Sequence, residues 1–384
     1  MKCVAITNFF PAHRGGLEII AGEILSRLSA DDGSGMKFEW FASETTSATG
    51  VAHRADDHAS VDPRVIIHAL PCWNLLERRT GLPMPVWPPH AILRLAQGIA
   101  RCDAVFLNDC LYPSSVIGWL LAKIYRRPVV VLQHIDMIPF RSRLLSWLMS
   151  AGYRVLGWLV LCHSAQVVFC SSKVEKYFKH LFPRSLSRSV RISNGLDVAV
   201  FSPGAIDSGI TLPARPRFLF AGRFIERKGL EILKELAIRF PGCDWVFAGW
   251  GVIDPAAWKL ANVIVAGSCD RTQMLELYRS CDALILPSAG EGFPLVVQEA
   301  ISCGLPAFVT PETASGDPAA AGVLIVAERS VGAFDAAVRA FLGRRREELS
   351  VEKRLARHRF AVANWGWNRI TAHWMEVFKG LEQA

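Results

Sequence analysis

Short apolar runs alternate with amphipathic stretches along the first half of the chain. The runs that predict strands are residues 2–7, 37–42, 65–69, 104–107, 129–132, 166–170 and 190–192. Between them apolar residues recur at helical spacing, as they do at Leu17, Ile20, Ile24 and Leu28. Short buried strands that alternate with helices are typical of a parallel sheet covered on both faces. The pattern therefore predicts an α/β fold with a doubly wound, Rossmann-like domain.

A second set of apolar runs repeats this pattern at residues 218–221, 245–248, 263–265, 283–286, 307–309 and 323–326. A stretch rich in Pro and Gly, residues 201–216, separates the two sets and indicates a linker. Because single cores rarely grow past about 250 to 300 residues, a chain of 384 residues is expected to form two domains. We predict an N-terminal domain over 1–200 and a C-terminal domain over 217–364.

The end of the chain, residues 365–384, predicts a terminal helix. Trp365, Trp367, Trp374 and Phe378 recur there at mostly helical spacing. Such a helix would pack either on its own domain or on the first one.

The most informative stretch follows a predicted strand, where residues 287–300 have the sequence PSAGEGFPLVVQEA. Pro294 suits the first position of a helix, and a helix begun there should stop near Gly304. The amides of Gly292 and Phe293 would then lie at the start of a helix, where anions such as phosphate bind.

Two glutamates stand in this segment, Glu291 and Glu299, separated by seven residues. Glu299 falls among apolar neighbours, so its carboxylate needs hydrogen-bond donors, and sugar hydroxyls would serve. The segment closely resembles the signature of the retaining, nucleotide-sugar-dependent glycosyltransferases of family 4 (glycosyl transferases group 1), which have the GT-B fold. The resemblance implies two Rossmann-like domains facing a cleft, with Glu291 on the hydroxyls of the donor sugar and Glu299 on the ribose. It also implies that the amides of Gly292 and Phe293 meet the diphosphate and the sugar. In the resembling family the terminal helix crosses back onto the first domain, which implies that residues 365–384 complete the N-terminal domain.

Residues 221–230, with the sequence AGRFIERKGL, carry the second match. The family shows the same G-R and K-G spacing after the first strand of its second domain, which implies that Arg223 and Lys228 grip the nucleotide diphosphate. Negative charge builds on the diphosphate as the sugar leaves, so two cations held there would stabilise the transition state. Trp250 departs from the smaller or charged residue expected in the nearby glycine turn, and we expect it to reshape that wall of the site.

In the first domain, residues 11–18 have the sequence PAHRGGLE and join the first predicted strand to the first predicted helix. Gly15 and Gly16 would let a ligand approach the backbone closely at this turn. The segment resembles the family's first loop, which lies against the donor diphosphate and the acceptor.

Three polar residues follow predicted strands of the first domain, at the edge where α/β sheets bind ligands: Asp109, His134 and Asp136. The segment VVVLQH resembles the family segment in which a histidine faces the donor sugar near the reacting carbon, which implies that role for His134. A lone histidine is more often structural, however, and Asp109 could equally cap a helix.

The net charge of +8 comes from the first half of the chain. Residues 123–191 hold twelve Lys and Arg against two acidic residues, Asp136 and Glu175, which predicts an anionic partner. Residues 141–163 are strongly apolar and admit three interpretations: a membrane-spanning helix, a buried pair of helices, or an interfacial patch. Arg154 interrupts the run and disfavours the spanning helix. In the patch interpretation the first domain docks on the cytoplasmic leaflet to reach a lipid-linked acceptor.

Together these features predict a retaining glycosyltransferase that moves a sugar from a nucleoside diphosphate sugar, UDP- or GDP-linked, to a hydroxyl acceptor. The expected acceptor is a lipid-linked or cell-surface glycan precursor, and no nucleic-acid partner is expected. No acid-rich D-x-D motif stands where metal-dependent sugar transferases carry one, so neither a metal nor another cofactor is expected.

The ten cysteines are scattered without paired or ligand spacing. This favours reduced thiols in a cytoplasmic protein, and the basic, apolar region would place it peripherally on the inner face of the plasma membrane. Two alternatives stay open for the function. One is a GT-B enzyme of other chemistry, such as a sugar-nucleotide epimerase, and the other is a non-catalytic sugar-nucleotide-binding subunit.

Overall fold

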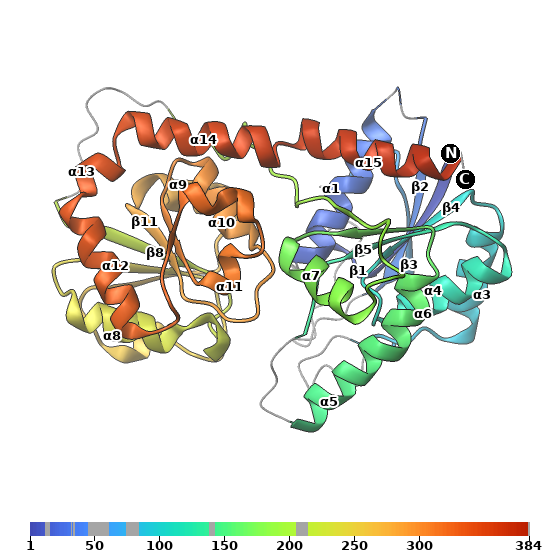
Figure 1. The fold of residues 1–384 in the computed structure, drawn as a ribbon, viewed down its shortest axis with the longest axis horizontal. Coiled ribbons are helices and arrows are strands. Elements are labelled where there is room, and N and C mark those ends of the chain that lie inside the picture. Colours follow the sequence, from blue (N-terminus) through green and yellow to red (C-terminus); the bar gives the residue numbers. More distant parts are fainter. Residues whose placement is uncertain are drawn as a thin grey trace. The chain divides into compact units, whose positions relative to one another are not determined.

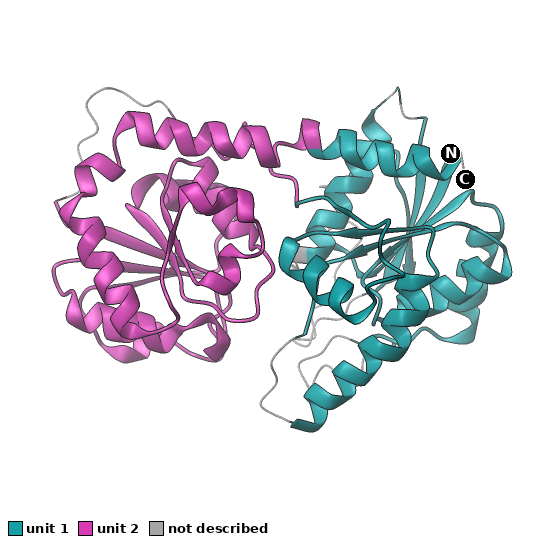
Figure 2. Ribbon diagram, viewed as in Figure 1, with its two compact units in different colours: residues 1–193, 370–384 teal, residues 194–369 magenta. Residues whose placement is uncertain are grey.

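The computed structural model describes residues 1–11, 16–31, 33, 35–44, 61–73, 84–137, 143–204 and 214–382. The chain divides into two compact units (Figure 2). Unit 1 comprises Met1–Ser193 with Ile370–Ala384, and unit 2 comprises Asn194–Arg369. Each unit is built around its own parallel sheet.

In the described part of unit 1, seven strands form one sheet in the order β3-β2-β1-β4-β5-β6-β7. The strands are β1 (Lys2–Phe9), β2 (Lys37–Ser43), β3 (Ile66–Leu70), β4 (Ala104–Asn108), β5 (Val129–Gln133), β6 (Gln166–Phe169) and β7 (Val190–Arg191). The helices are α1 (Gly16–Ala30), α3 (Pro89–Ala100), α4 (Pro113–Ile124), α5 (Arg143–Gly152), η3 (Tyr153–Gly157), α6 (Trp158–Cys162) and α7 (Ser172–Leu181). Strands β4 and β5 are buried along their whole length, as expected of central strands covered by helices (Figure 1).

The last helix of the chain, α15 (Trp367–Glu382), brings aromatic side chains onto the sheet of unit 1. The ring centroid of Trp374 lies 5.6 Å from that of Phe106 in β4, and the ring of Phe378 lies 5.8 Å from that of Phe38 in β2. Both contacts are edge-to-face, and all four rings are buried. The chain end therefore completes the core of unit 1.

In the described part of unit 2, six strands form a second parallel sheet in the order β10-β9-β8-β11-β12-β13. The strands are β8 (Arg217–Ala221), β9 (Asp244–Ala248), β10 (Val263–Gly267), β11 (Ala283–Leu286), β12 (Ala307–Val309) and β13 (Leu324–Val326). The helices are η4 (Glu226–Lys228), α8 (Leu230–Arg239), η5 (Pro255–Trp258), α9 (Arg271–Ser280), α10 (Leu295–Ser302), α11 (Pro311–Ala314), η6 (Pro318–Val323), α12 (Val331–Gly343), α13 (Arg345–Glu348) and α14 (Val351–Trp365).

The thirteen predicted strands are all confirmed within the described chain, each to within two residues at either end. Two expected boundaries are wrong. Phe201 lies in the hydrophobic core of unit 2 rather than in a linker, because unit 2 begins at Asn194; residues 205–213 of the expected linker lie outside the described residues. Trp365 ends α14 rather than opening the terminal helix, because its indole Nε1 donates a hydrogen bond of 2.8 Å to Asp317 Oδ2 inside unit 2.

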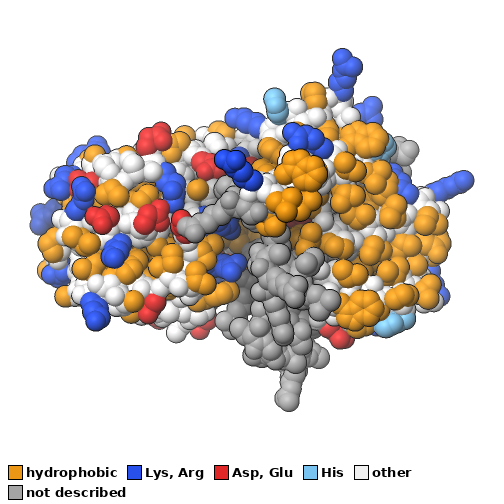
Figure 3. All heavy atoms as spheres, turned by 90° about the horizontal axis from the view of Figure 1, so that it is seen from below, with side chains coloured by type: hydrophobic (Ala, Val, Ile, Leu, Met, Phe, Trp, Pro, Cys, Tyr) orange, Lys and Arg blue, Asp and Glu red, His pale blue; other side chains and the backbone are white. Residues whose placement is uncertain are grey.

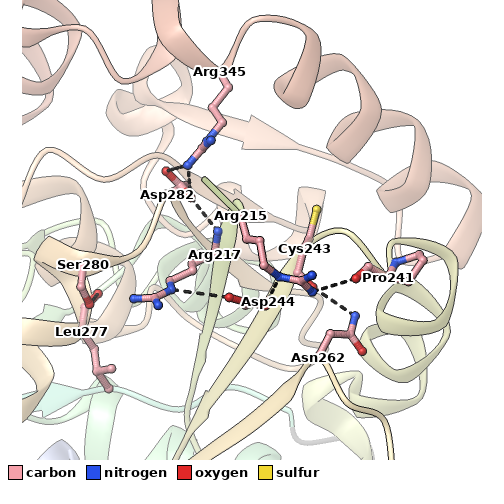
Figure 4. Close-up of polar contacts among 10 residues, drawn as sticks. All are labelled: Arg215, Arg217, Pro241, Cys243, Asp244, Asn262, Leu277, Ser280, Asp282 and Arg345. Atoms are coloured by element: carbon pink, nitrogen blue, oxygen red, sulfur yellow. Dashed lines mark hydrogen bonds and ion pairs between the residues drawn. The ribbon is translucent and has the colours of Figure 1, made fainter. Parts of the chain in front are cut away.

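The amino-terminal ends of the strands in unit 2 carry a network of polar contacts (Figure 4). Asp282, just before β11, accepts hydrogen bonds from the backbone N–H of Arg217 at 2.6 Å and from the guanidinium of Arg345 at 2.9 Å. At the start of β9, Asp244 accepts one from Arg215 at 2.8 Å. These contacts tie the starts of β8, β9 and β11 together, so this end of the sheet is structural. A ligand site is expected at the opposite, carboxyl ends of the strands.

Candidate functional site

Both sheets reverse their strand order at one point, between β1 and β4 in unit 1 and between β8 and β11 in unit 2. In open α/β sheets, the loops that follow the strands beside such a point leave a crevice in which ligands bind. In unit 2 these loops hold Arg223, Lys228 and Glu291. In unit 1, Asp109 follows β4, and His134 follows β5 next to it. Each unit therefore carries polar residues that were predicted from the sequence at the carboxyl ends of its strands, where α/β sheets bind ligands.

Lys228 and Glu291 meet across the reversal point of unit 2. Lys228 Nζ lies 2.6 Å from Glu291 Oε1, and the two side chains are only 11% and 14% exposed. Gly229 permits this approach, because it has a φ of 77° and a Cβ built there would lie 2.3 Å from the carbonyl oxygen of Pro287. A side chain at residue 229 would push the two loops apart, so the glycine is a geometric requirement of the pair.

Arg223 shares a loop with Lys228 and is exposed. Its guanidinium carbon lies 5.1 Å from the ring centroid of Trp250, and among the described residues no carboxylate forms an ion pair with it. Trp250 reaches this position because the loops after β8 and β9 meet backbone to backbone. A Cβ on Gly249, whose φ is 141°, would lie 1.9 Å from the carbonyl oxygen of Gly222. The indole thus forms a platform that orients Arg223 while leaving its charge available.

The start of α10 presents backbone rather than side chains. Pro294 is not the first helical residue, as expected from the sequence, but the cap before it. Its ψ of 140° is extended, and its carbonyl accepts the first helical hydrogen bond from Val297 at 3.0 Å. The ring of Phe293 is buried, with its centroid 5.5 Å from that of Trp365, so at Gly292 and Phe293 a ligand would meet the backbone and not the ring.

Glu299, in the second turn of α10, receives a hydrogen bond from a side chain of the protein. The hydroxyl of Tyr278 in α9 donates to Glu299 Oε2 at 2.7 Å. Burial raises the pKa of Glu299 above its ordinary value, while the Tyr278 hydroxyl and the charge of Arg271 act against that rise. The donors that this carboxylate was expected to need are thus partly supplied within unit 2.

His134 in unit 1 is buried, with 7% of its surface exposed. Its Nε2 atom has no hydrogen-bond partner among the described residues. Burial lowers the pKa of His134 to about 3, so its imidazole is neutral near pH 7. A neutral imidazole with an unpartnered nitrogen can donate to, or accept from, an oxygen of a ligand.

Asp109 holds the segment that contains His134. Its Oδ1 accepts hydrogen bonds from the backbone N–H groups of His134 and Ile135, each at 3.3 Å, and from the side-chain amide of Gln133. Its φ of 62° is uncommon for a residue with a side chain. Burial raises the pKa of Asp109 to about 7, and the nearby Glu18 acts in the same direction. Asp109 positions this loop and does not cap a helix, since the cap of α4 is Tyr112.

The remaining residues predicted for the site in unit 1 are Gly15, Gly16 and Asp136. Gly15 lies outside the described residues, and Gly16 opens α1. Asp136 is engaged inside the unit, because its Oδ2 lies 3.3 Å from Lys173 Nζ and its carbonyl accepts a hydrogen bond from the Tyr153 hydroxyl at 3.2 Å. Its side chain is therefore a structural ion-pair partner in this structure.

Sequence reasoning missed two residues of the site, Gln133 and Tyr278. Gln133 is a fully buried amide at the end of an apolar strand, and that polar residue in an apolar run is a signal that could have found it. Tyr278 offers no such signal, because it meets Glu299 only through the packing of α9 against α10.

Two family models match the chain. Residues 14–200 match Glycosyltransferase Family 4, and residues 210–356 match Glycosyl transferases group 1. The chain belongs to the family 4 glycosyltransferases. The resemblance seen in residues 221–230 and 287–300 is thereby confirmed, and the protein is a transferase enzyme.

Several known proteins are similar to this glycosyltransferase. The glycogen synthase of Mycobacterium tuberculosis is 29% identical over 300 residues, which cover 74% of this chain and 70% of the relative. The N,N'-diacetylbacillosaminyl-diphospho-undecaprenol alpha-1,3-N-acetylgalactosaminyltransferase of Campylobacter jejuni is 23% identical over 240 residues, 56% of this chain and 62% of the relative. The structure of Anabaena HepE in complex with UDP and glucose aligns over 99% of both chains with a TM-score of 0.74 and 16% identity. This likeness confirms the GT-B fold.

Proposed function

We propose that this glycosyltransferase moves a sugar, with retention of anomeric configuration, from a nucleoside diphosphate sugar to a hydroxyl acceptor. The observation that carries the proposal is the pairing of Lys228 with Glu291 at the strand-order reversal of unit 2, with Arg223 on the same loop. Two cations suit a diphosphate, and a carboxylate suits sugar hydroxyls. The donor is UDP- or GDP-linked in this proposal, and the likeness to a protein solved with UDP and glucose supports the first.

Each side chain of the site then has a part in the transfer. Arg223 and Lys228 hold the diphosphate and stabilise the charge that builds on it as its bond to the anomeric carbon breaks. Glu291 orients the donor sugar, and Glu299 accepts hydrogen bonds from the ribose. His134 contacts a hydroxyl of the donor sugar through its unpartnered Nε2. The two cations take the part that a metal has in metal-dependent transferases, so we propose no metal and no other cofactor.

Backbone amides complete the donor site in this proposal. Those of Gly292 and Phe293 lie before α10, and Gly16 opens α1, where N–H groups attract an anion. Gly15, its neighbour in the sequence, is proposed to take part with it. For retention we propose front-face attack, in which the acceptor oxygen approaches from the side that the diphosphate leaves. Its proton passes to the departing phosphate oxygen, so no side chain bonds covalently to the sugar.

The proposed acceptor is a lipid-linked or cell-surface glycan precursor. The relative from Campylobacter jejuni carries a diphospho-undecaprenol-linked sugar in its name, whereas the relative from Mycobacterium tuberculosis is a glycogen synthase. The basic character of residues 123–191 favours the lipid-linked case, because cations near the surface are attracted to anionic lipids. The enzyme would then work in the cytoplasm, peripherally on the inner face of the plasma membrane.

A thermal-shift screen with UDP, GDP, ADP, dTDP and their common sugar conjugates tests the donor site. A ligand that binds only the folded state raises its stability by mass action, so one nucleotide series should raise the Tm. Lys228→Ala should abolish the shift. Lys234→Ala makes the same change of charge at an exposed position of α8 and should keep it. No shift with any nucleotide, or a shift that survives in Lys228→Ala, would overturn the proposal.

A further inference from the structure

The apolar run of unit 1 forms one continuous helix, Arg143–Cys162, in which α5, the π-helical turn η3 and α6 follow without a break. By length and composition this helix could cross a membrane, yet only 22% of its most apolar 18-residue window is buried. No residue of α5 is buried, and α5 projects from the unit (Figure 1). The buried helix pair considered from the sequence is therefore wrong for this half of the run.

The second half of the helix is anchored in unit 1. Tyr153, Val160 and Leu161 are buried in its hydrophobic core. The hydroxyl of Tyr153 also donates to the carbonyls of Ile135 and Asp136, each at 3.2 Å. Inserting the helix across a bilayer would unpack these contacts, so a spanning placement conflicts with the fold. The exposed side of the helix can instead rest on a surface.

That exposed side presents large apolar side chains at helical spacing. Leu144, Trp147 and Val155 are each 64% exposed, Leu148 is 51% exposed and Trp158 is 47% exposed. Figure 3 shows hydrophobic side chains gathered over unit 1 on the face that is seen from below. We define the apolar face as the side chains of Leu144, Trp147, Leu148, Val155 and Trp158, together with that of Ile124 at the end of α4.

The end of α4 adjoins the helix and extends the apolar face. Ile124 is 70% exposed there. The ammonium group of the preceding Lys123 donates a hydrogen bond to the carbonyl of His163, which follows α6. The ring of His163 in turn lies edge-on to that of Trp158, with 4.6 Å between centroids. These contacts place the end of α4 beside the end of the helix Arg143–Cys162, so Ile124 adds to the same region of exposed apolar side chains.

Basic side chains border the apolar face. Arg143 and Arg154 are exposed on the helix itself, and Lys123 and Arg126 are exposed at the end of α4. The two acidic residues of the 123–191 region are both neutralised by ion pairs, Asp136 with Lys173 and Glu175 with Lys179. A second copy of this chain would bring like charges together, which disfavours self-association. The complementary partner is anionic and must also accept exposed tryptophans.

We infer that the apolar face and its basic border dock unit 1 on an anionic lipid bilayer, with the helix Arg143–Cys162 lying in the interface. Trp147 and Trp158 suit that depth, because indole combines a large apolar ring with a polar N–H. This docking surface adds a membrane partner to the proposed function. The inference rests on the proposed function only for the identity of the acceptor.

Vesicle flotation without any nucleotide tests the inference. The wild type should float with vesicles of phosphatidylcholine mixed with phosphatidylglycerol and not with phosphatidylcholine alone, and salt should release it. Arg143→Ala with Arg154→Ala should weaken binding about 30-fold, because each cation near an anionic surface contributes about 1 kcal/mol. Trp147→Ser with Trp158→Ser should weaken it about 10-fold or more through lost apolar burial. The control, Ile238→Ser with Val252→Ser, removes exposed apolar side chains from unit 2 and should bind as the wild type does.

Any of three results would overturn the inference. The wild type floats with neither kind of vesicle, it floats equally with both, or the Trp147→Ser, Trp158→Ser variant binds as fully as the wild type. Self-association seen by light scattering and abolished by the same substitutions would assign the apolar face to a second copy instead. The nucleotide-induced thermal shift checks that each variant is folded, and it reports the proposed donor site separately, so failure of one leaves the other standing.

Discussion

The ion pair between Lys228 and Glu291 is mostly removed from water, so each partner depends on the other in a way that can be measured. The informative variants are Lys228→Met and Glu291→Gln, alone and together. Both replacements remove the charge; Gln keeps the length of the Glu side chain, and Met is an unbranched side chain one atom shorter than Lys. The two single variants should lose similar stability, but their effects on nucleotide binding should differ in sign and size.

The expected loss of stability follows from burial. Removing one partner of a fully buried pair costs about 3 to 5 kcal/mol, because it leaves a charge without compensation. With the two side chains 11% and 14% exposed, water reaches the pair, and each single variant should lose about 2 kcal/mol of unfolding free energy. The double variant keeps no unpaired charge and should lose about 1 kcal/mol, which gives a coupling of about 3 kcal/mol.

Nucleotide binding should respond differently to the two replacements. Lys228→Met removes a cation from the diphosphate and should weaken binding about 100-fold. Glu291→Gln removes a negative charge beside the diphosphate and should strengthen binding about 5-fold, corresponding to about 1 kcal/mol of relieved repulsion. Turnover by Glu291→Gln should nevertheless fall at least about 10-fold, because a neutral amide holds the sugar hydroxyls less firmly.

Urea unfolding measures the stability of the four proteins, and calorimetric titration with the nucleotide found in the thermal-shift screen measures binding. Lys234→Ala should match the wild type in both measurements. Strictly additive stability losses in the double variant would refute the coupling. Equal weakening of nucleotide binding by Lys228→Met and Glu291→Gln would refute the assignment of opposite electrostatic effects.

Three other substitutions test separate parts of the structure. Arg223→Ala should lower turnover about 100-fold or more, and near-normal turnover would remove Arg223 from the site. Gly229→Ala should lower the free energy of unfolding by roughly 2 to 4 kcal/mol, since its Cβ would meet the Pro287 carbonyl oxygen at 2.3 Å; Gly242→Ala, with open space around it, should be neutral or slightly stabilising in the same urea titration. The pKa of Asp109, about 7, lies above the ordinary value of about 4, so between these pH values the folded protein holds a proton that the unfolded chain has lost. The stability of the wild type relative to Asp109→Asn should therefore fall as the pH rises through that window, by at most about 1.4 kcal/mol per pH unit, and a constant difference would contradict the raised pKa.

The strands and the chemistry of unit 2 could be predicted from sequence for different reasons. A run such as 283–286 is short, apolar and bounded by polar residues, which local patterning identifies as a buried strand. The roles of Arg223, Lys228 and Glu291 came from a family resemblance. Their juxtaposition has its physical cause in the sheet order, which places β8 beside β11 and which no local pattern reports.

Contacts made only by tertiary packing stayed beyond sequence reasoning. The hydrogen bond from Tyr278 to Glu299 depends on how α9 lies against α10, and the support of the His134 loop depends on the left-handed backbone of Asp109. The sequence also did not show which side of the helix Arg143–Cys162 is exposed. A π-helical turn at Tyr153–Gly157 shifts the helical phase, so a fixed spacing cannot show which side faces the core.

Transfer of a sugar from a nucleotide donor with retention is the central claim. The most direct measurement follows the anomeric proton of the donor sugar by NMR while the wild type turns over the nucleotide sugar chosen by the thermal-shift screen, with a membrane lipid extract as acceptor. We predict release of the nucleoside diphosphate and a product whose anomeric configuration matches that of the donor, both lost in Lys228→Ala. A product of inverted configuration, an epimerised sugar, or a bound donor that stays intact would contradict the claim.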